Sequence, residues 1–190
     1  MSEPRVMHLL TQHGGGSTML CNMLDNHPQI NCKHEAAENF NDVGTYLKIL
    51  KPRQDVVLMH QHYTYINNWD MFKGHKVILL ERLDNVCGAI KSNMFGHFRP
   101  AGWEYPTEFI KHNTDLRYER YREMEKIADK HIILEEIAPT FIDHLSIKDT
   151  FDICNFLGVE IEPLICTATR NRTDDYLPVN MGELYASANS

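Results

Sequence analysis

The sequence predicts an α/β fold in which a central, mainly parallel sheet lies between layers of helices. Short apolar runs of strand length alternate with longer segments of helical spacing, which is typical of parallel strands joined by crossover helices. Three consecutive glycines also link the first run directly to the first helical segment. The chain has 190 residues, enough for one sizeable core, so we expect a single domain over residues 1–190.

Four apolar runs predict strands, and a shorter fifth run adds another. In chain order they are "RVMHLL" (5–10), the shorter "INCKHE" (30–35), "DVVLMH" (55–60), "HKVILLE" (75–81) and "KHIILEE" (130–136). Apolar residues occupy consecutive positions in these runs, which indicates strands covered on both faces of the sheet.

Three helices are expected between and after these strands. The first begins at the glycines, carries Met19, Leu20, Met23 and Leu24 at helical spacing, and ends at "HP" (27–28). The second opens at Pro106 in its first turn, and its other face is charged and expected to be solvated. Its apolar stripe is Phe109, Ile110, Leu116, Tyr121, Met124 and Ile127.

The third helix is predicted over about residues 144 to 157, with Gly158 at its end. Its apolar positions are Leu145, Ile147, Phe151, Ile153, Phe156 and Leu157. Residues 93–106, rich in Gly, Pro and aromatics, are expected to form a long surface loop that suits substrate contacts.

Composition excludes several functional classes. The net charge of −7 makes the protein surface as a whole unsuited to binding nucleic acid, because no excess of cationic side chains is available to displace phosphate counterions. No apolar stretch is long enough for a membrane span and no leader is evident, so we expect a cytoplasmic protein without a transmembrane segment. The cysteines form no C-x-x-C pair and are expected to be buried free thiols: Cys21, Cys32, Cys87, Cys154 and Cys166.

The segment Gly14 to Thr18 has the design of an anion-binding loop. Glycines let the backbone approach an anion closely, and a helix that begins just after them aims N–H groups and a positive dipole end at it. Ser17 and Thr18 add hydroxyl donors. The loop lacks the lysine of a Walker A motif and the spacing of a dinucleotide-binding fingerprint. Taken alone, it could also be a tight strand-to-helix turn without a ligand.

Downstream motifs make the chain resemble the sulfotransferases that use 3′-phosphoadenosine 5′-phosphosulfate (PAPS). In that family a strand leads into a P-[RK]-S-G-[ST]-T loop that binds the 5′-phosphosulfate, and "HGGGSTMLCNMLDNHPQI" matches from Gly16 onward. A later strand ends in an arginine and its helix carries a serine, and the two hold the 3′-phosphate. "KVILLERLDNVCGAIKS" is similar, with Arg82 and Ser92 in these places. The resemblance implies a three-layer, P-loop NTPase-like fold.

Two weaker similarities follow in the same order along the chain. "HIILEEI" resembles the family's later strand that ends in an acidic pair, and "FDICNFLGVEIE" resembles its helix ending in F-L-G-V. Residues 93–130 match nothing specific in the family.

The loop departs from the family at one position, because the family's loop cation aligns with Gly14. Three residues are candidates to supply the missing positive charge: His13, one residue earlier, and Arg170 and Arg172 in the C-terminal segment, where the resemblance implies basic contacts to the donor. A neutral loop histidine and a solvated turn are the alternative interpretations of these residues.

Sulfuryl transfer to an alcohol needs a base that takes the hydroxyl proton. The resemblance places Glu35 in this role, because part of the family uses a glutamate just after the second strand. His34 is the alternative base, and Glu38 is expected to face solvent. A carboxylate at a helix N-terminus is the alternative interpretation of Glu35.

His60 and His62 are expected to project from the same side of a strand at its carboxyl end, where ligands of α/β proteins bind. Two histidines at this spacing can ligate a metal, but the sequence indicates no third ligand. Contacts to the acceptor or plain strand-end positions are therefore preferred, and no metal is expected.

Together these features predict a sulfotransferase that transfers a sulfuryl group from PAPS to a hydroxyl or amine of a small-molecule, lipid or glycan acceptor, leaving 3′,5′-adenosine bisphosphate (PAP). A non-catalytic PAP-binding relic of the fold is the alternative, and a P-loop kinase is a weaker one. The acceptor and the oligomeric state do not follow from the sequence.

Overall fold

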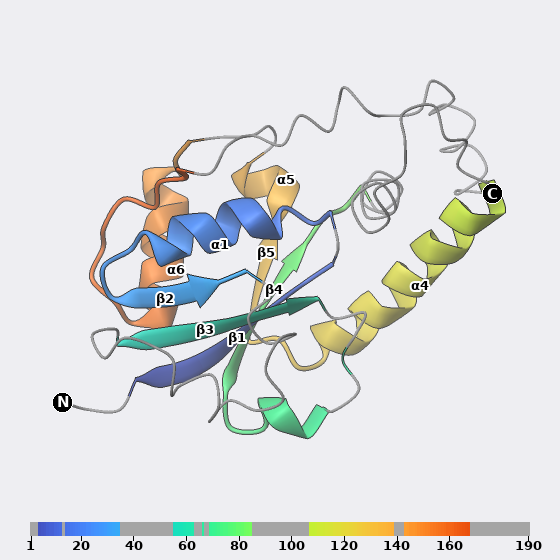
Figure 1. The fold of residues 1–190 in the computed structure, drawn as a ribbon, viewed down its shortest axis with the longest axis horizontal. Helices are drawn as coiled ribbons and strands as arrows, with labels where there is room; N and C mark the ends of the chain where they lie inside the picture. The colour runs from blue at the N-terminus through green and yellow to red at the C-terminus, as the bar shows by residue number, and fades with distance from the viewer. Residues whose placement is uncertain are drawn as a thin grey trace.

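Figure 1 shows the computed structural model of the chain, which describes residues 4–12, 14–34, 55–62, 66, 69–84, 107–138 and 143–167. The predicted loop at 93–106, the serine at 92 and Cys87 lie outside these residues. Within them, no helix is long and apolar enough to cross a membrane.

A five-stranded, all-parallel sheet forms the centre of the fold, in the order β2-β3-β1-β4-β5. The strands are β1 (Arg5–Thr11), β2 (Ile30–Lys33), β3 (Val56–His62), β4 (Lys76–Glu81) and β5 (Lys130–Ile133). All five predicted strands are therefore confirmed. Strand β1 lies between β3 and β4, so the glycine loop that follows it leaves the middle of the sheet.

Helices cover both faces of this sheet (Figure 1). One face packs against α1 (Ser17–Asp25) and α6 (Ile147–Leu157), and the other against α4 (Thr107–Glu125) and the 3-10 helix η3 (Trp69–Phe72). A short helix, α5 (Leu134–Ile137), follows β5 directly. This arrangement confirms the predicted α/β/α sandwich.

Strand β1 shows why the runs are apolar on both faces. Met7 and Leu9 belong to the core beneath α1 and α6, whereas Leu10 belongs to the core beneath α4. Successive side chains point to opposite faces of a sheet, so a strand covered on both sides must be apolar at consecutive positions.

The helix ends follow local sequence signals. Gly16, which has a left-handed backbone conformation, directly precedes helix α1. Ser146 caps the start of α6, and its side chain accepts a hydrogen bond from the Asp149 amide. Gly158, with φ of 65°, ends α6 as predicted.

Three details differ from the sequence-based expectations. The acidic pair Glu135 and Glu136 belongs to α5 rather than to the end of a strand. Ile147 and Phe151 are exposed on α6, because the buried side of this helix is formed by Thr150, Ile153, Cys154 and Leu157. On α4, Arg117 is buried rather than solvated. The described cysteines are buried and form no disulfide, as predicted: Cys21, Cys32, Cys154 and Cys166.

Candidate functional site

The carboxyl ends of the parallel strands bring the candidate residues to one edge of the sheet. The glycine loop follows β1, His34 follows β2, His60 and His62 end β3, and Arg82 follows β4. Because β2, β3, β1 and β4 are consecutive neighbours in the sheet, residues from four distant parts of the sequence meet at this edge. This is the edge at which open α/β sheets bind their ligands.

The backbone of the loop requires glycine at successive positions. The Gly15 amide donates to the Gln12 carbonyl at 2.9 Å, and a Cβ on Gly15 would lie 2.8 Å from that same carbonyl oxygen. Gly16 has φ of 82°, and a Cβ there would lie 2.7 Å from a methyl group of Leu134. The loop is therefore a tight turn packed closely against Leu134 of α5 and against the backbone of Gln12.

The first turn of α1 presents polar groups next to this turn. The helix has no side-chain cap at its N-terminus, and amides in the first turn of a helix have no partner within the helix. Ser17 is buried and its Oγ lies 2.9 Å from His34 Nε2, whereas Thr18 is exposed, with its Oγ1 3.5 Å from the same nitrogen. Backbone amides, two hydroxyls and an imidazole thus meet at the start of α1.

Gln12, two residues before Gly14, connects three parts of the site. Its Nε2 donates to the Arg82 carbonyl at 3.1 Å, its Oε1 accepts from Arg117 Nη1 at 3.0 Å, and its carbonyl holds Gly15. Gln12 and Arg117 are both buried. The buried guanidinium of Arg117 on α4 is therefore linked to the glycine loop through a single residue, Gln12.

The segment that carries Arg82 is held from its other side by α5. The Glu135 carboxylate accepts from the amides of Leu83 and Asp84, at 3.1 and 3.4 Å. Glu135, the first residue of the acidic pair, thus has a positioning role, because Gln12 and Glu135 together hold the backbone from the Arg82 carbonyl to the Asp84 amide.

Glu81, the last residue of β4, faces α4 and not the loop. Partial burial raises the pKa of its carboxyl group, and a hydrogen bond with Tyr121 on α4 acts in the opposite direction. Burial and the same carboxyl group also raise the pKa of the Tyr121 hydroxyl. This pair joins the sheet edge to α4 on the side away from α1.

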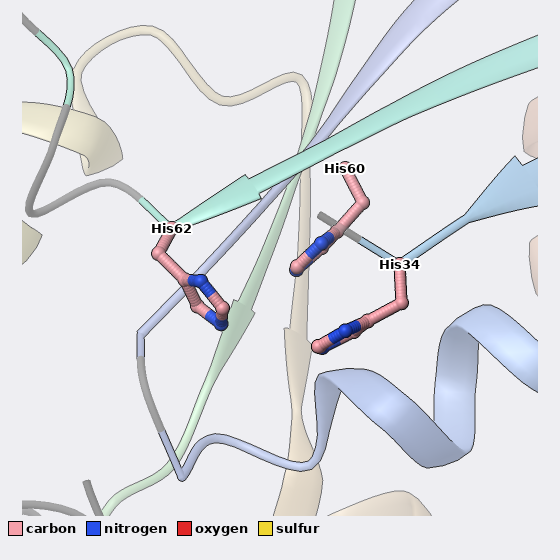
Figure 2. Close-up of side chains that lie close together, drawn as sticks. All are labelled: His34, His60 and His62. Carbon is pink, nitrogen blue, oxygen red and sulfur yellow. The ribbon is translucent and has the colours of Figure 1, made fainter. Parts of the chain in front are cut away.

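His34, His60 and His62 form a cluster on the α1 side of the sheet edge, with their rings directed toward one another (Figure 2). One ring nitrogen from each lies within 4.8 Å of the others. The ring centroids of His34 and His60 are 4.7 Å apart and stacked, those of His60 and His62 are 5.0 Å apart, and those of His34 and His62 are 5.6 Å apart.

Two of these rings are each in contact with a hydroxyl group. Thr11 Oγ1, at the end of β1, lies 2.8 Å from His60 Nε2, and Ser17 Oγ lies 2.9 Å from His34 Nε2. His60 and His62 are buried, and His34 is the most accessible of the three. The cluster is therefore tied to both ends of the glycine loop.

The structure brings together Gly14, Gly15, Gly16, Ser17, Thr18, His34, His60, His62 and the backbone of Arg82. The other predicted site residues, at positions 13, 35, 92, 170 and 172, lie outside the described residues.

Sequence reasoning missed Thr11, Gln12, Arg117 and the inclusion of His34 in the cluster. A signal for Arg117 was present, because it precedes Tyr121 and the buried Met124 by four and seven residues and so shares their side of α4.

Comparison with known proteins supports the fold. No protein-family model matches the chain, and no curated protein matches it in sequence. Among solved structures, the chain is similar to the sulfotransferase domain from the Synechococcus PCC 7002 olefin synthase, with a TM-score of 0.59 and 15% identity. The match covers 100% of this chain and 88% of that domain. The chain therefore has a sulfotransferase-like fold.

Proposed function

We propose that the protein is a sulfotransferase that uses PAPS and transfers its sulfuryl group to a hydroxyl or amine of an acceptor. One observation carries this proposal: in a sulfotransferase-like fold, the glycine loop, the first turn of α1 and the segment of Arg82 meet at the carboxyl edge of the sheet and are linked through Gln12.

In this proposal each part of the edge has a chemical task. The amides of the glycine loop and the start of α1, with the Ser17 and Thr18 hydroxyls, hold the 5′-phosphosulfate, because such groups stabilise anions at helix N-termini. Arg82 and Ser92 hold the 3′-phosphate, for which a guanidinium supplies paired donors. Arg117 contributes positive charge from behind the loop.

The transfer step forms one bond to sulfur and breaks another. The acceptor oxygen or nitrogen attacks the sulfur atom, and the bond from sulfur to the bridging oxygen of the 5′-phosphate breaks, so PAP leaves with the electron pair. Glu35 takes the proton that the acceptor loses. Positioning and stabilisation of the negative charge on the leaving oxygen account for the rate increase.

Calorimetric titration with PAP tests the donor site. We expect one PAP per chain, and an Arg82→Ala variant that binds PAP about 100-fold more weakly, because charge-assisted hydrogen bonds are lost. Arg120→Ala is the matched control, since Arg120 lies on the surface of α4 in an ion pair with Glu123. Equal PAP affinity in the Arg82 variant and the wild type would contradict the 3′-phosphate assignment.

A turnover assay distinguishes an enzyme from a protein that only binds PAP. The non-catalytic protein is the second candidate, because position 14 is a glycine where a loop cation would be expected. Wild-type protein is incubated with PAPS and a panel of alcohol and amine acceptors, and PAP release is followed. We expect release that depends on the acceptor, and a Glu35→Gln variant that binds PAP normally but transfers ~10²- to 10⁴-fold more slowly, as for loss of a general base. An unimpaired rate would remove Glu35 from this role.

A further inference from the structure

We infer that His34, His60 and His62 form a binding site for a transition-metal ion of the Zn²⁺ class, directly beside the glycine loop. The inference rests on the convergence of three imidazole rings at the carboxyl ends of two neighbouring strands, with one nitrogen of each within 4.8 Å of the others (Figure 2). It goes beyond the proposed function and departs from the expectation that the protein needs no metal.

The spacing of the rings fits three ligands on one side of an ion. A Zn–N bond of about 2.0–2.1 Å and N–Zn–N angles of about 90–109° place imidazole centroids about 4.5–5.2 Å apart. The observed separations are 4.7, 5.0 and 5.6 Å. Two of these separations lie within this range, and the third, between His34 and His62, exceeds it, so the His34 ring must approach His62 for all three nitrogens to reach one ion.

One specific adjustment is required. The His34 and His60 rings are stacked with an interplanar angle of 15°, and two stacked planes cannot both contain the same ion. His34 is the most accessible ring of the cluster and follows β2 rather than lying within it. We expect the His34 ring to turn on binding, while His60 and His62 keep their positions in β3.

The surroundings resemble those of metal-binding histidines in proteins. Such rings are oriented by outer hydrogen-bond partners, and here the hydroxyls of Thr11 and Ser17 contact the rings of His60 and His34. Imidazole ligands suit zinc, copper, iron and nickel rather than magnesium or calcium. Three protein ligands leave a fourth position open, which is the pattern of catalytic rather than structural zinc sites.

The place of the cluster gives such an ion a function. His34 lies 2.9 Å from the hydroxyl of Ser17, the first residue after the glycines, so the ion would put two positive charges beside the loop whose family cation aligns with Gly14. A metal ion can polarise an oxygen of a transferring group. This role, unlike the binding of the ion itself, rests on the proposed function.

Metal titration of the full chain tests the site without any nucleotide. Protein stripped by a chelator is titrated with Zn²⁺ by calorimetry and with Co²⁺ by visible absorption. We expect one ion per chain and a Co²⁺ spectrum of low coordination number. His34→Ala and His62→Gln should each bind at least ~100-fold more weakly, which exceeds the loss that follows removal of an outer partner. His112→Ala, at an exposed position of α4, is the matched control and should bind normally.

A graded variant separates this site from a general affinity of histidines for metals. Thr11→Val removes the hydroxyl that contacts His60 and should weaken Zn²⁺ binding by ~10- to 100-fold. Circular dichroism establishes that each variant is folded. Absence of Zn²⁺ binding by the wild type would overturn the inference, and so would one-to-one binding that persists in both His34→Ala and His62→Gln.

A second titration keeps the two proposals apart. PAP is titrated into stripped and into Zn²⁺-loaded wild-type protein. PAP binding to both forms with Zn²⁺ binding absent would leave the donor site intact and overturn only the metal site. Zn²⁺ binding with no PAP binding to either form would support the metal site and contradict the proposed function.

Discussion

The three consecutive glycines have separate physical causes. Gly15 lies against the Gln12 carbonyl, and Gly16 lies against Leu134 with a positive φ. Gly14, at the position where the family that the sequence resembles carries a loop cation, has φ of 70°. A residue with a side chain pays about 1–2 kcal/mol in this conformation, so the turn itself disfavours a lysine or arginine there. The shape of the loop is thus a physical reason for glycine at this position, and under the proposed function buried Arg117 supplies positive charge from another element.

Replacement of Gly15 by alanine tests whether the shape of the loop matters for the donor. The new Cβ would lie 2.8 Å from the Gln12 carbonyl oxygen, which belongs to the backbone and must shift. We expect PAP affinity to fall by about tenfold or more, as measured by calorimetry, because the loop amides are displaced from the anion.

Gly74→Ala is the control for this substitution. Gly74 has φ of 79° and no atom within 4 Å of an added Cβ, so alanine there adds backbone strain, of about 1 kcal/mol, but no contact near the site. PAP affinity should remain at the wild-type value. An equal loss of affinity in the two variants would show that general destabilisation, and not loop geometry, governs binding.

At the level of elements, sequence patterns predicted the five strands and the three main helices because both are set by local periodicity. They could not predict the histidine cluster. His34 and His60 are 26 positions apart, and they meet because β2 pairs with β3, with Ile30 opposite Val56. The hydrophobic pattern of a single strand does not indicate which other strands it pairs with. Likewise, the charged side of α4 was expected in solvent, whereas Arg117 is buried and its guanidinium donates a hydrogen bond to Gln12.

Helix α5 is expected to act on ligand binding through Glu135. Loss of its carboxylate in Glu135→Ala would release the amides of Leu83 and Asp84 and loosen the segment that carries Arg82. We expect PAP to bind about 3- to 10-fold more weakly, the effect of about 1 kcal/mol for a hydrogen bond to a carboxylate at an accessible site.

Glu136→Ala is the matched control, because Glu136 is the next residue on the same short helix and is exposed. Its PAP affinity should equal that of the wild type. If both variants bound PAP like the wild type, Glu135 would have no role in positioning Arg82.

At the level of the whole molecule, one buried histidine in the central strand links stability to pH. His8 is fully buried in β1, and burial, together with the nearby His75, lowers its pKa to about 4 from 6.5. The unfolded chain therefore binds a proton at this residue at a higher pH than the folded chain does. This contribution to stability is fully present above pH about 6.5 and is lost as the pH falls toward about 4.

The predicted loss between these pH values is about 3 kcal/mol, on the order of 1.36 kcal/mol per pH unit. Urea unfolding of the wild type at pH 7, 6, 5 and 4 measures it. His8→Gln cannot titrate, so its stability should fall less over the same range, whereas His112→Gln, at an exposed helical position, should behave like the wild type. A His8→Gln variant with the full wild-type decline would place the acid sensitivity elsewhere.

The central claim is that the glycine loop and Arg82 hold the two ends of one nucleotide at the carboxyl edge of the sheet. A crystal structure of the protein with PAP bound tests it most directly. We expect the 5′-phosphate within hydrogen-bond distance of the amides of residues 14–18 and the 3′-phosphate at the Arg82 guanidinium. A nucleotide bound elsewhere, or an empty loop in crystals saturated with PAP, would contradict it.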